Sequence, residues 1–292
     1  MNRFISHTCI FLLSILAAFL VLAAASSKFN AINWLFFQPT TGFESEPVTI
    51  AAIEEALADS TEGGLLIVGS SVCKNSINPR LLSELIQTPV HQFCTGGQSV
   101  QGALAIADFL NARLKPDAIV LDLYPRVAEE QIVEGCMRIM LGHPDGRTAL
   151  ARFNAWSIAD DWPLRYLWAR SWVSSYFSAS KERGQKQQIP GFLCAEDKPA
   201  MPTVIERNSV EIDPIALNAM REWTSEHPEV RFIVNLPPLH GGQFEPLDGE
   251  PYIGLAPKFM DDSCFFDSHH MRCECSDQYT TELAQSLEPH LD

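Results

Sequence analysis

Uninterrupted apolar runs alternate along the chain with segments whose apolar residues recur at helical spacing. The run Leu65–Gly69 is bounded by glycines, which is typical of a central strand in a parallel sheet. Comparable runs predict strands at Pro89–Cys94, Ala118–Leu123, Val230–Leu236 and Ser263–Phe266.

The segments with helical spacing lie between or beside these runs. They predict helices at Thr49–Ala58, Pro79–Gln87, Ser99–Leu114, Asp213–Glu226 and Ser276–Leu291. Ser99 and Asp213 can cap the helices that begin there, and Pro79 and Pro214 lie in the first turn of theirs. Strands and helices therefore alternate along the chain and are joined by short connections. This alternation predicts an α/β fold with a parallel sheet covered on both faces.

The alternation breaks between Tyr124 and Asn208, where arginine and tryptophan are frequent. We interpret about 127–208 as a mostly helical insertion or cap. Its tryptophans can stack on sugar rings, but their spacing favours packing in a core or near a membrane.

The N-terminus carries an apolar segment from about Ile10 to Ala25, preceded by Arg3. Its length lies between that of a signal peptide and that of a membrane span. Apolar residues resume at Ile32–Phe37, which favours a retained anchor over a cleaved signal. We expect an anchor or signal at 1–28, a linker at 29–48 and one α/β domain at 49–292. The charge pattern predicts a single pass through the inner (cytoplasmic) membrane, with the domain facing the periplasm or the cell exterior.

Composition excludes some classes of function. With 46% apolar and 20% charged residues the chain is globular, and a formal charge of −15 argues against nucleic acid as a partner. Seven of the eight cysteines lie beyond the expected anchor or signal at 1–28, so an exported domain is expected to hold one or more disulfides and at least one thiol.

Candidate catalytic residues follow three of the expected strands. Ser71 lies after the first, Gly97 after the second, and Asp267 and His270 after the last. In parallel sheets, ligands bind at the carboxyl ends of the strands. There His270 can act as the base for a Ser71 nucleophile, with Asp267 orienting the imidazole. The backbone amides of Ser71 and Gly97 are the candidate oxyanion hole.

Three short motifs carry a family resemblance: Gly69-Ser70-Ser71, Gly97-x-Ser99 and Asp267-x-x-His270. Together they resemble the SGNH (GDSL-like) hydrolases, and more closely their membrane-anchored branch, which includes alginate O-acetylation factors and a protein of teichoic acid D-alanylation. The resemblance implies a flavodoxin-like three-layer α/β/α fold, a Ser-His-Asp triad and acyl chemistry on carbohydrate. It also implies a membrane-bound O-acyltransferase as partner.

Two positions depart from that family. Ser70 stands where Asp is usual, and no asparagine follows the third strand, where the chain reads Leu121-Asp122-Leu123-Tyr124-Pro125-Arg126. Losing one oxyanion donor costs on the order of 3 kcal/mol. Arg126 is a candidate substitute. An α/β-hydrolase elbow is excluded, because it requires glycine where Cys73 stands.

Histidines and cysteines crowd the stretch 269–275, but a second pair of metal ligands is missing from the sequence at suitable spacing. We therefore expect no metal and no cofactor, and instead a disulfide from Cys273 or Cys275 to Cys264 or a more distant partner. His240 follows a strand and can approach the site, although a structural loop is the favoured interpretation.

These patterns lead to one expectation of function and two alternatives. We expect a membrane-anchored, extracytoplasmic acyl esterase or O-acyltransferase acting on cell-envelope or exopolysaccharide carbohydrate. One alternative is a catalytically weak scaffold protein of an envelope polysaccharide complex. The other is a periplasmic esterase that works without partners.

Overall fold

A computed structural model of the chain describes residues 11, 13–18, 21, 62–96, 98–123, 140, 144–152, 192, 199–202, 208–210, 212–244, 247, 251–256 and 258–291. No helix within these ranges is long and apolar enough to cross a membrane. Most of the expected anchor, the linker, the helix at Thr49–Ala58 and most of the insertion lie outside them.

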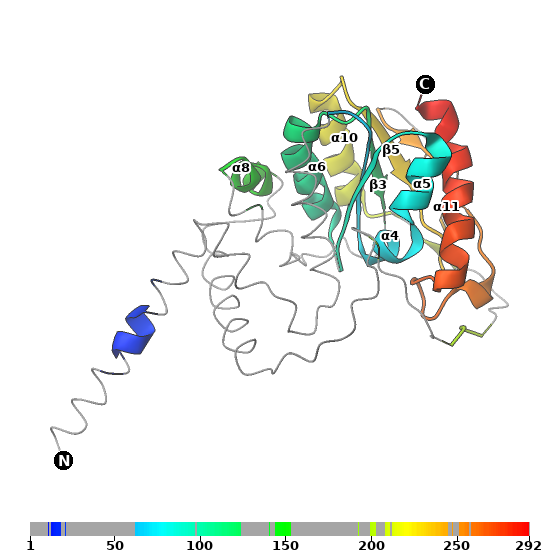
Figure 1. Ribbon diagram of the computed structural model, residues 1–292, viewed down its shortest axis with the longest axis horizontal. Coiled ribbons are helices and arrows are strands. Elements are labelled where there is room, and N and C mark those ends of the chain that lie inside the picture. The colour runs from blue at the N-terminus through cyan, green and yellow to red at the C-terminus, as the bar shows by residue number, and fades with distance from the viewer. Residues whose placement is uncertain are drawn as a thin grey trace, which may run out of the picture.

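The described part of the chain forms a parallel five-stranded sheet, so the predicted α/β class is confirmed (Figure 1). The strand order is β2-β1-β3-β5-β7, and every pairing is parallel. The strands are β1 (Leu65–Gly69), β2 (Val90–Cys94), β3 (Ala118–Asp122), β5 (Arg231–Asn235) and β7 (Ile253–Gly254). The chain passes from β1 outward to β2 and then crosses to β3 on the other side of β1. The strand order therefore reverses between β1 and β3, which is where parallel sheets open a crevice for ligands.

Helices cover both faces of this sheet (Figure 1). One face packs against α6 (Val100–Leu114) and α10 (Pro214–Glu226), and the other against α5 (Pro79–Ile86) and α11 (Cys273–Leu287). Alternation along β1 explains the division: Leu66 and Val68 enter the first core, whereas Leu65 and Ile67 enter the second.

The caps expected from the sequence are present. Ser99 accepts a hydrogen bond from the amide of Gly102 at the start of α6, and Asp213 accepts one from Ile215 at the start of α10. Both helices therefore begin where the sequence places them. Beside α6 lies α8 (Pro144–Arg152), a helix within the expected insertion.

Two expectations for the C-terminal region are wrong. The stretch Ser263–Phe266 is not a sheet strand: a 3₁₀ turn, η2, spans Asp262–Cys264, and Phe265 forms an isolated bridge with Met271. Asp261 caps that turn by accepting a bond from the amide of Ser263, which bends the backbone where a strand was expected. The last strand of the sheet is instead β7, in a stretch where no strand was expected.

Smaller differences concern ends and short elements. The final helix begins at Cys273, three residues before its expected start, and passes into a 3₁₀ turn, η3 (Glu288–His290). A short helix, α4 (Ser71–Ser76), follows β1 without an intervening loop. The two strands β4 (Asn208–Val210) and β6 (Gly242–Phe244) pair with each other outside the main sheet.

Candidate active site

Ser71 lies at the junction of β1 and α4, on the carboxyl edge of the sheet. Gly69 ends the strand, and Ser70 is the N-cap of the helix, its hydroxyl accepting a hydrogen bond from the amide of Val72 at 3.2 Å. Ser71 is therefore the first residue of α4. Glycine is needed at position 69 because a Cβ there would lie 2.9 Å from both Cβ and the carbonyl oxygen of Asp122 on β3.

A disulfide and a backbone bond hold this junction to the neighbouring strand. Cys73, two residues past the candidate nucleophile, is bonded to Cys94 at the end of β2. The amide of Thr95 donates to the carbonyl of Gly69 at 3.1 Å. One link starts from α4 and the other from the last residue of β1, and both lead to the carboxyl end of β2, so they restrict movement of Ser71 relative to the sheet.

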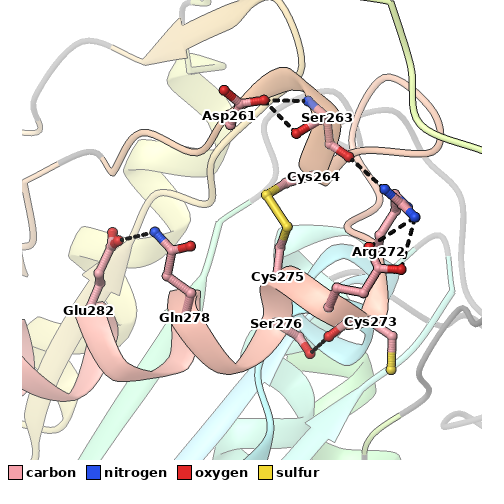
Figure 2. The surroundings of a disulfide bond; sticks show 10 residues. Asp261, Ser263, Cys264, Arg272, Cys273, Cys275, Ser276, Gln278 and Glu282 are labelled. Atoms are coloured by element: carbon pink, nitrogen blue, oxygen red, sulfur yellow. Dashed lines mark hydrogen bonds and ion pairs between the residues drawn. A yellow bond between two sulfur atoms is a disulfide. The ribbon is translucent and has the colours of Figure 1, made fainter.

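Asp267 and His270 lie in a turn that is closed at its base. The amide of Phe266 donates to the carbonyl of His270, and the bridge of Phe265 with Met271 lies just inside the disulfide Cys264–Cys275. Figure 2 shows this disulfide joining the η2 region to the first turn of α11. The expected disulfide from Cys264 is thus confirmed; Cys273 is disulfide-bonded as well.

The structure brings Ser71, His270 and Asp267 into one hydrogen-bonded chain. The Oγ of Ser71 lies 2.7 Å from Nε2 of His270, and Nδ1 of the same ring lies 2.7 Å from Oδ2 of Asp267. Both distances suit strong hydrogen bonds. With Nδ1 donating to the carboxylate, Nε2 is unprotonated and accepts the bond from the serine hydroxyl, which is the tautomer a general base needs.

Asp267 is held as an anion. Burial by itself would raise the pKa of its carboxyl. Hydrogen bonds from the His270 ring and from the amides of His269 and His270 lower the pKa by more than burial raises it, so the pKa lies well below the usual range. A carboxylate that stays ionised can orient the ring and stabilise an imidazolium at any ordinary pH.

The oxyanion side of the site is described only in part. Because Ser71 opens α4, its amide has no acceptor within the helix and can donate to a substrate oxygen. Gly97, the second expected donor, and Arg126, the candidate substitute for asparagine, both lie outside the described residues.

A buried polar cluster lies where the family's asparagine was expected, and the sequence did not reveal it. The side-chain amide of Asn235, at the end of β5, donates to Oδ2 of Asp122 at 2.6 Å and to the hydroxyl of Tyr279 at 2.7 Å. Burial raises the pKa of Asp122 to about 7, against the lowering effects of Asn235 and Lys258. Burial also lowers the pKa of Lys258 to about 8. Asp122 is directed into the core beside α11, so its carboxyl does not take the missing donor's place.

Two further histidines lie near the turn. His269 stacks at a tilt on His270, with ring centroids 4.0 Å apart, and Nδ1 of His269 lies 3.7 Å from Oδ1 of Asp267. The Nε2 of His240 bonds to the carbonyl of Pro202, which agrees with the structural interpretation of that residue. Asp267, His269 and His270 are also the one group in the described ranges with the spacing of metal ligands.

Comparisons with family models, curated proteins and solved structures find no match for this chain. The chemistry of the site is therefore inferred from its own geometry: a serine, a histidine and a carboxylate in hydrogen-bonded sequence at the carboxyl edge of a parallel sheet.

Proposed function

We propose that this protein is a serine-dependent acyl esterase or O-acyltransferase, with Ser71 as nucleophile, His270 as general base and Asp267 as the orienting carboxylate. The observation that carries the proposal is the pair of 2.7 Å contacts that His270 makes, one through each ring nitrogen. Serine is a weak nucleophile, and a base at this distance is what activates it.

In the first step, Oγ of Ser71 attacks the acyl carbon of an ester while its proton passes to Nε2 of His270. The tetrahedral oxyanion accepts a hydrogen bond from the backbone N–H of Ser71. When the intermediate collapses, the ester C–O bond breaks and His270 returns the proton to the leaving alcohol. Asp267, ionised throughout, stabilises the imidazolium formed in between.

In the second step, a hydroxyl group takes the acyl group from Ser71. His270 removes the proton of this hydroxyl as its oxygen bonds to the acyl carbon. The bond between the acyl carbon and Oγ of Ser71 then breaks, and His270 returns the proton to Oγ. Water as acceptor gives an esterase, and a sugar hydroxyl gives an O-acyltransferase. Side-chain exposure of 20% for His270 and 40% for Asp267 leaves the base within reach of either acceptor.

The sheet supports assignment to an SGNH-like fold. Counted along the sheet strands alone, the order is 2-1-3-4-5, that of flavodoxin-like folds, and the proposed nucleophile follows the first strand beside the switch point. The Asp-x-x-His segment just before the last helix agrees with the same family pattern.

The proposed location follows from the N-terminal apolar segment, and the proposed substrate follows from the resemblance to the SGNH hydrolases. We place the domain outside the inner membrane, anchored by a single pass through residues 1–28, with cell-envelope or exopolysaccharide carbohydrate as substrate. In the transfer version, a membrane-bound O-acyltransferase supplies the acyl group. Pull-down of a multi-spanning membrane protein with the full-length chain tests that partner and separates transfer from a partner-free esterase.

Hydrolysis of p-nitrophenyl acetate by the full-length protein tests the catalytic part. Ser71→Ala is expected to remove turnover. Ser268→Ala, which deletes a hydroxyl between Asp267 and His270 without removing a triad contact, is expected to keep it. Equal turnover by wild type and Ser71→Ala would contradict the proposal.

A second function is favoured by the direction of Asp122. With that side chain bonded to Asn235 and buried, the described residues at the end of β3, as far as Leu123, offer no asparagine-like donor, and one lost donor costs on the order of 3 kcal/mol. A weakly catalytic scaffold of a polysaccharide complex has that property. It predicts that Ser71→Ala still supports polysaccharide acylation in cells, whereas the enzyme proposal predicts that acylation is lost.

A further inference from the structure

His269 has no role in the proposed triad, yet its ring is held beside it. Its Nδ1 lies 2.8 Å from Oγ of Ser268 and 3.7 Å from Oδ1 of Asp267, and its ring is in contact with that of His270. Two imidazoles and a carboxylate thus come from three positions of a single closed turn.

The spacing of these groups suits a metal ion. One ligand atom from each of Asp267, His269 and His270 lies within 4.8 Å of the others. Imidazole and carboxylate are ligands that Zn²⁺ binds at about 2 Å, with a fourth position left to water in sites that have three protein ligands. The three side chains are 40%, 27% and 20% exposed, so an ion can reach them from solvent.

The described residues provide no competing thiolate. Cys73, Cys94, Cys264, Cys273 and Cys275 are all disulfide-bonded, so none of them is a thiolate ligand for zinc. The disulfide Cys264–Cys275 and the bridge from Phe265 to Met271 also close the turn, which lowers the cost of ordering the ligands when an ion binds.

We propose that Asp267, His269 and His270 form an inhibitory Zn²⁺ site. An ion held there takes a ring nitrogen of His270 and an oxygen of Asp267 as ligands. It therefore breaks the hydrogen-bonded chain from Ser71 through His270 to Asp267. His269 is the ligand that belongs to the metal site alone.

Binding of Zn²⁺ does not depend on the proposed reaction, whereas its inhibitory effect rests on the proposed function. The experiment therefore measures Zn²⁺ affinity and ester hydrolysis separately. Tag-free full-length protein is prepared without reductant or chelator, and its affinity for Zn²⁺ is measured by calorimetry. Hydrolysis of p-nitrophenyl acetate is followed in the same buffer, with recovery after addition of EDTA.

The matched variants are His269→Gln and His290→Gln. His290 is a partly exposed histidine in η3, and its carbonyl accepts a bond from Arg231 at the opposite, starting end of β5. Wild type and His290→Gln are expected to bind one Zn²⁺ with equal affinity. His269→Gln is expected to bind at least about tenfold more weakly, the loss that even outer-sphere substitutions produce, and to keep its hydrolysis rate in the absence of metal.

Absence of Zn²⁺ binding by the wild type, or equal affinity in His269→Gln, would overturn the site. Binding that depends on His269 without inhibition of an active enzyme would overturn its inhibitory role. If the protein binds Zn²⁺ through His269 but hydrolyses no ester, the metal site stands and the proposed function fails.

Discussion

Replacing Asp267 by asparagine tests how the carboxylate acts in the proposed triad. Oδ1 of Asp267 accepts hydrogen bonds from the backbone amides of His269 at 3.0 Å and His270 at 2.7 Å. Oδ2 accepts one from Nδ1 of the His270 ring. An asparagine keeps its single oxygen on the two backbone amides, so its NH₂ group faces Nδ1. A donor there forces the imidazole proton onto Nε2, the atom that must accept the proton of Ser71.

The magnitude follows from that change of tautomer. The same substitution in the serine-protease triad lowers kcat about 10⁴-fold with the geometry intact, and a loss of that size corresponds to about 5 kcal/mol of transition-state stabilisation. We therefore expect Asp267→Asn to lose about 10⁴-fold in kcat for acetyl ester hydrolysis, with KM little changed.

The control is Asp277→Asn, an exposed aspartate on α11 whose Oδ1 accepts a bond from the side chain of Asn78. It should leave kcat within about twofold, since the carboxylate of Asp277 is bonded to Asn78 and takes no part in the hydrogen-bonded chain of Ser71, His270 and Asp267. Circular dichroism checks that both variants fold. If folded Asp267→Asn keeps more than a tenth of wild-type kcat, the orienting role of the carboxylate is refuted.

Three further predictions concern stability. Gly69→Ala should lower the free energy of unfolding by about 1–3 kcal/mol, measured by urea denaturation, because its Cβ would meet Asp122 at 2.9 Å; no loss would contradict the close approach. The pKa of Asp122 is higher in the folded than in the unfolded state. Its contribution to the free energy of unfolding should therefore be complete below the usual pKa of 3.8 and be lost, by about 4 kcal/mol, as the pH rises through about 7. Asp122→Asn should abolish that loss. The double variant Cys264→Ser/Cys275→Ser should lose about 3 kcal/mol by loop closure together with esterase turnover, and unchanged kcat would show that the disulfide does not position His270.

Four strands of the sheet, β1, β2, β3 and β5, could be predicted because their sequence signals are local. Leu65–Gly69 is continuously apolar and bounded by glycines, and the structure confirms it residue for residue. The starts of α6 and α10 were equally clear, since Ser99 and Asp213 are capping residues at the head of an apolar period.

The element before the proposed base could not be predicted in the same way. A short apolar run such as Cys264-Phe265-Phe266 has the pattern of a strand and of a buried turn alike. The turn forms because Asp261 caps a 3₁₀ helix and because Cys264 is bonded to Cys275. Disulfide pairing is a tertiary fact that spacing along the chain does not determine.

The contact between Ser71 and His270 was predicted, but half of the reasoning behind it was wrong. Ser71 follows β1 and therefore lies at the carboxyl edge of the sheet. His270 reaches the same edge from a turn that follows a 3₁₀ helix and an isolated bridge, with no sheet strand before it. The buried cluster of Asp122, Asn235 and Tyr279 gave no such signal, because polar residues at strand ends usually indicate exposed loops. Its members become neighbours only when β3, β5 and α11 pack together.

The most direct test of the account is covalent labelling of the full-length protein with a fluorophosphonate, followed by mass spectrometry of its peptides. Reaction with such a probe requires a serine activated by a base. We expect one adduct, on Ser71, that is absent in Ser71→Ala and in His270→Ala and present in Ser268→Ala. An unlabelled wild-type protein, or labelling that persists without the His270 ring, would contradict the central claim.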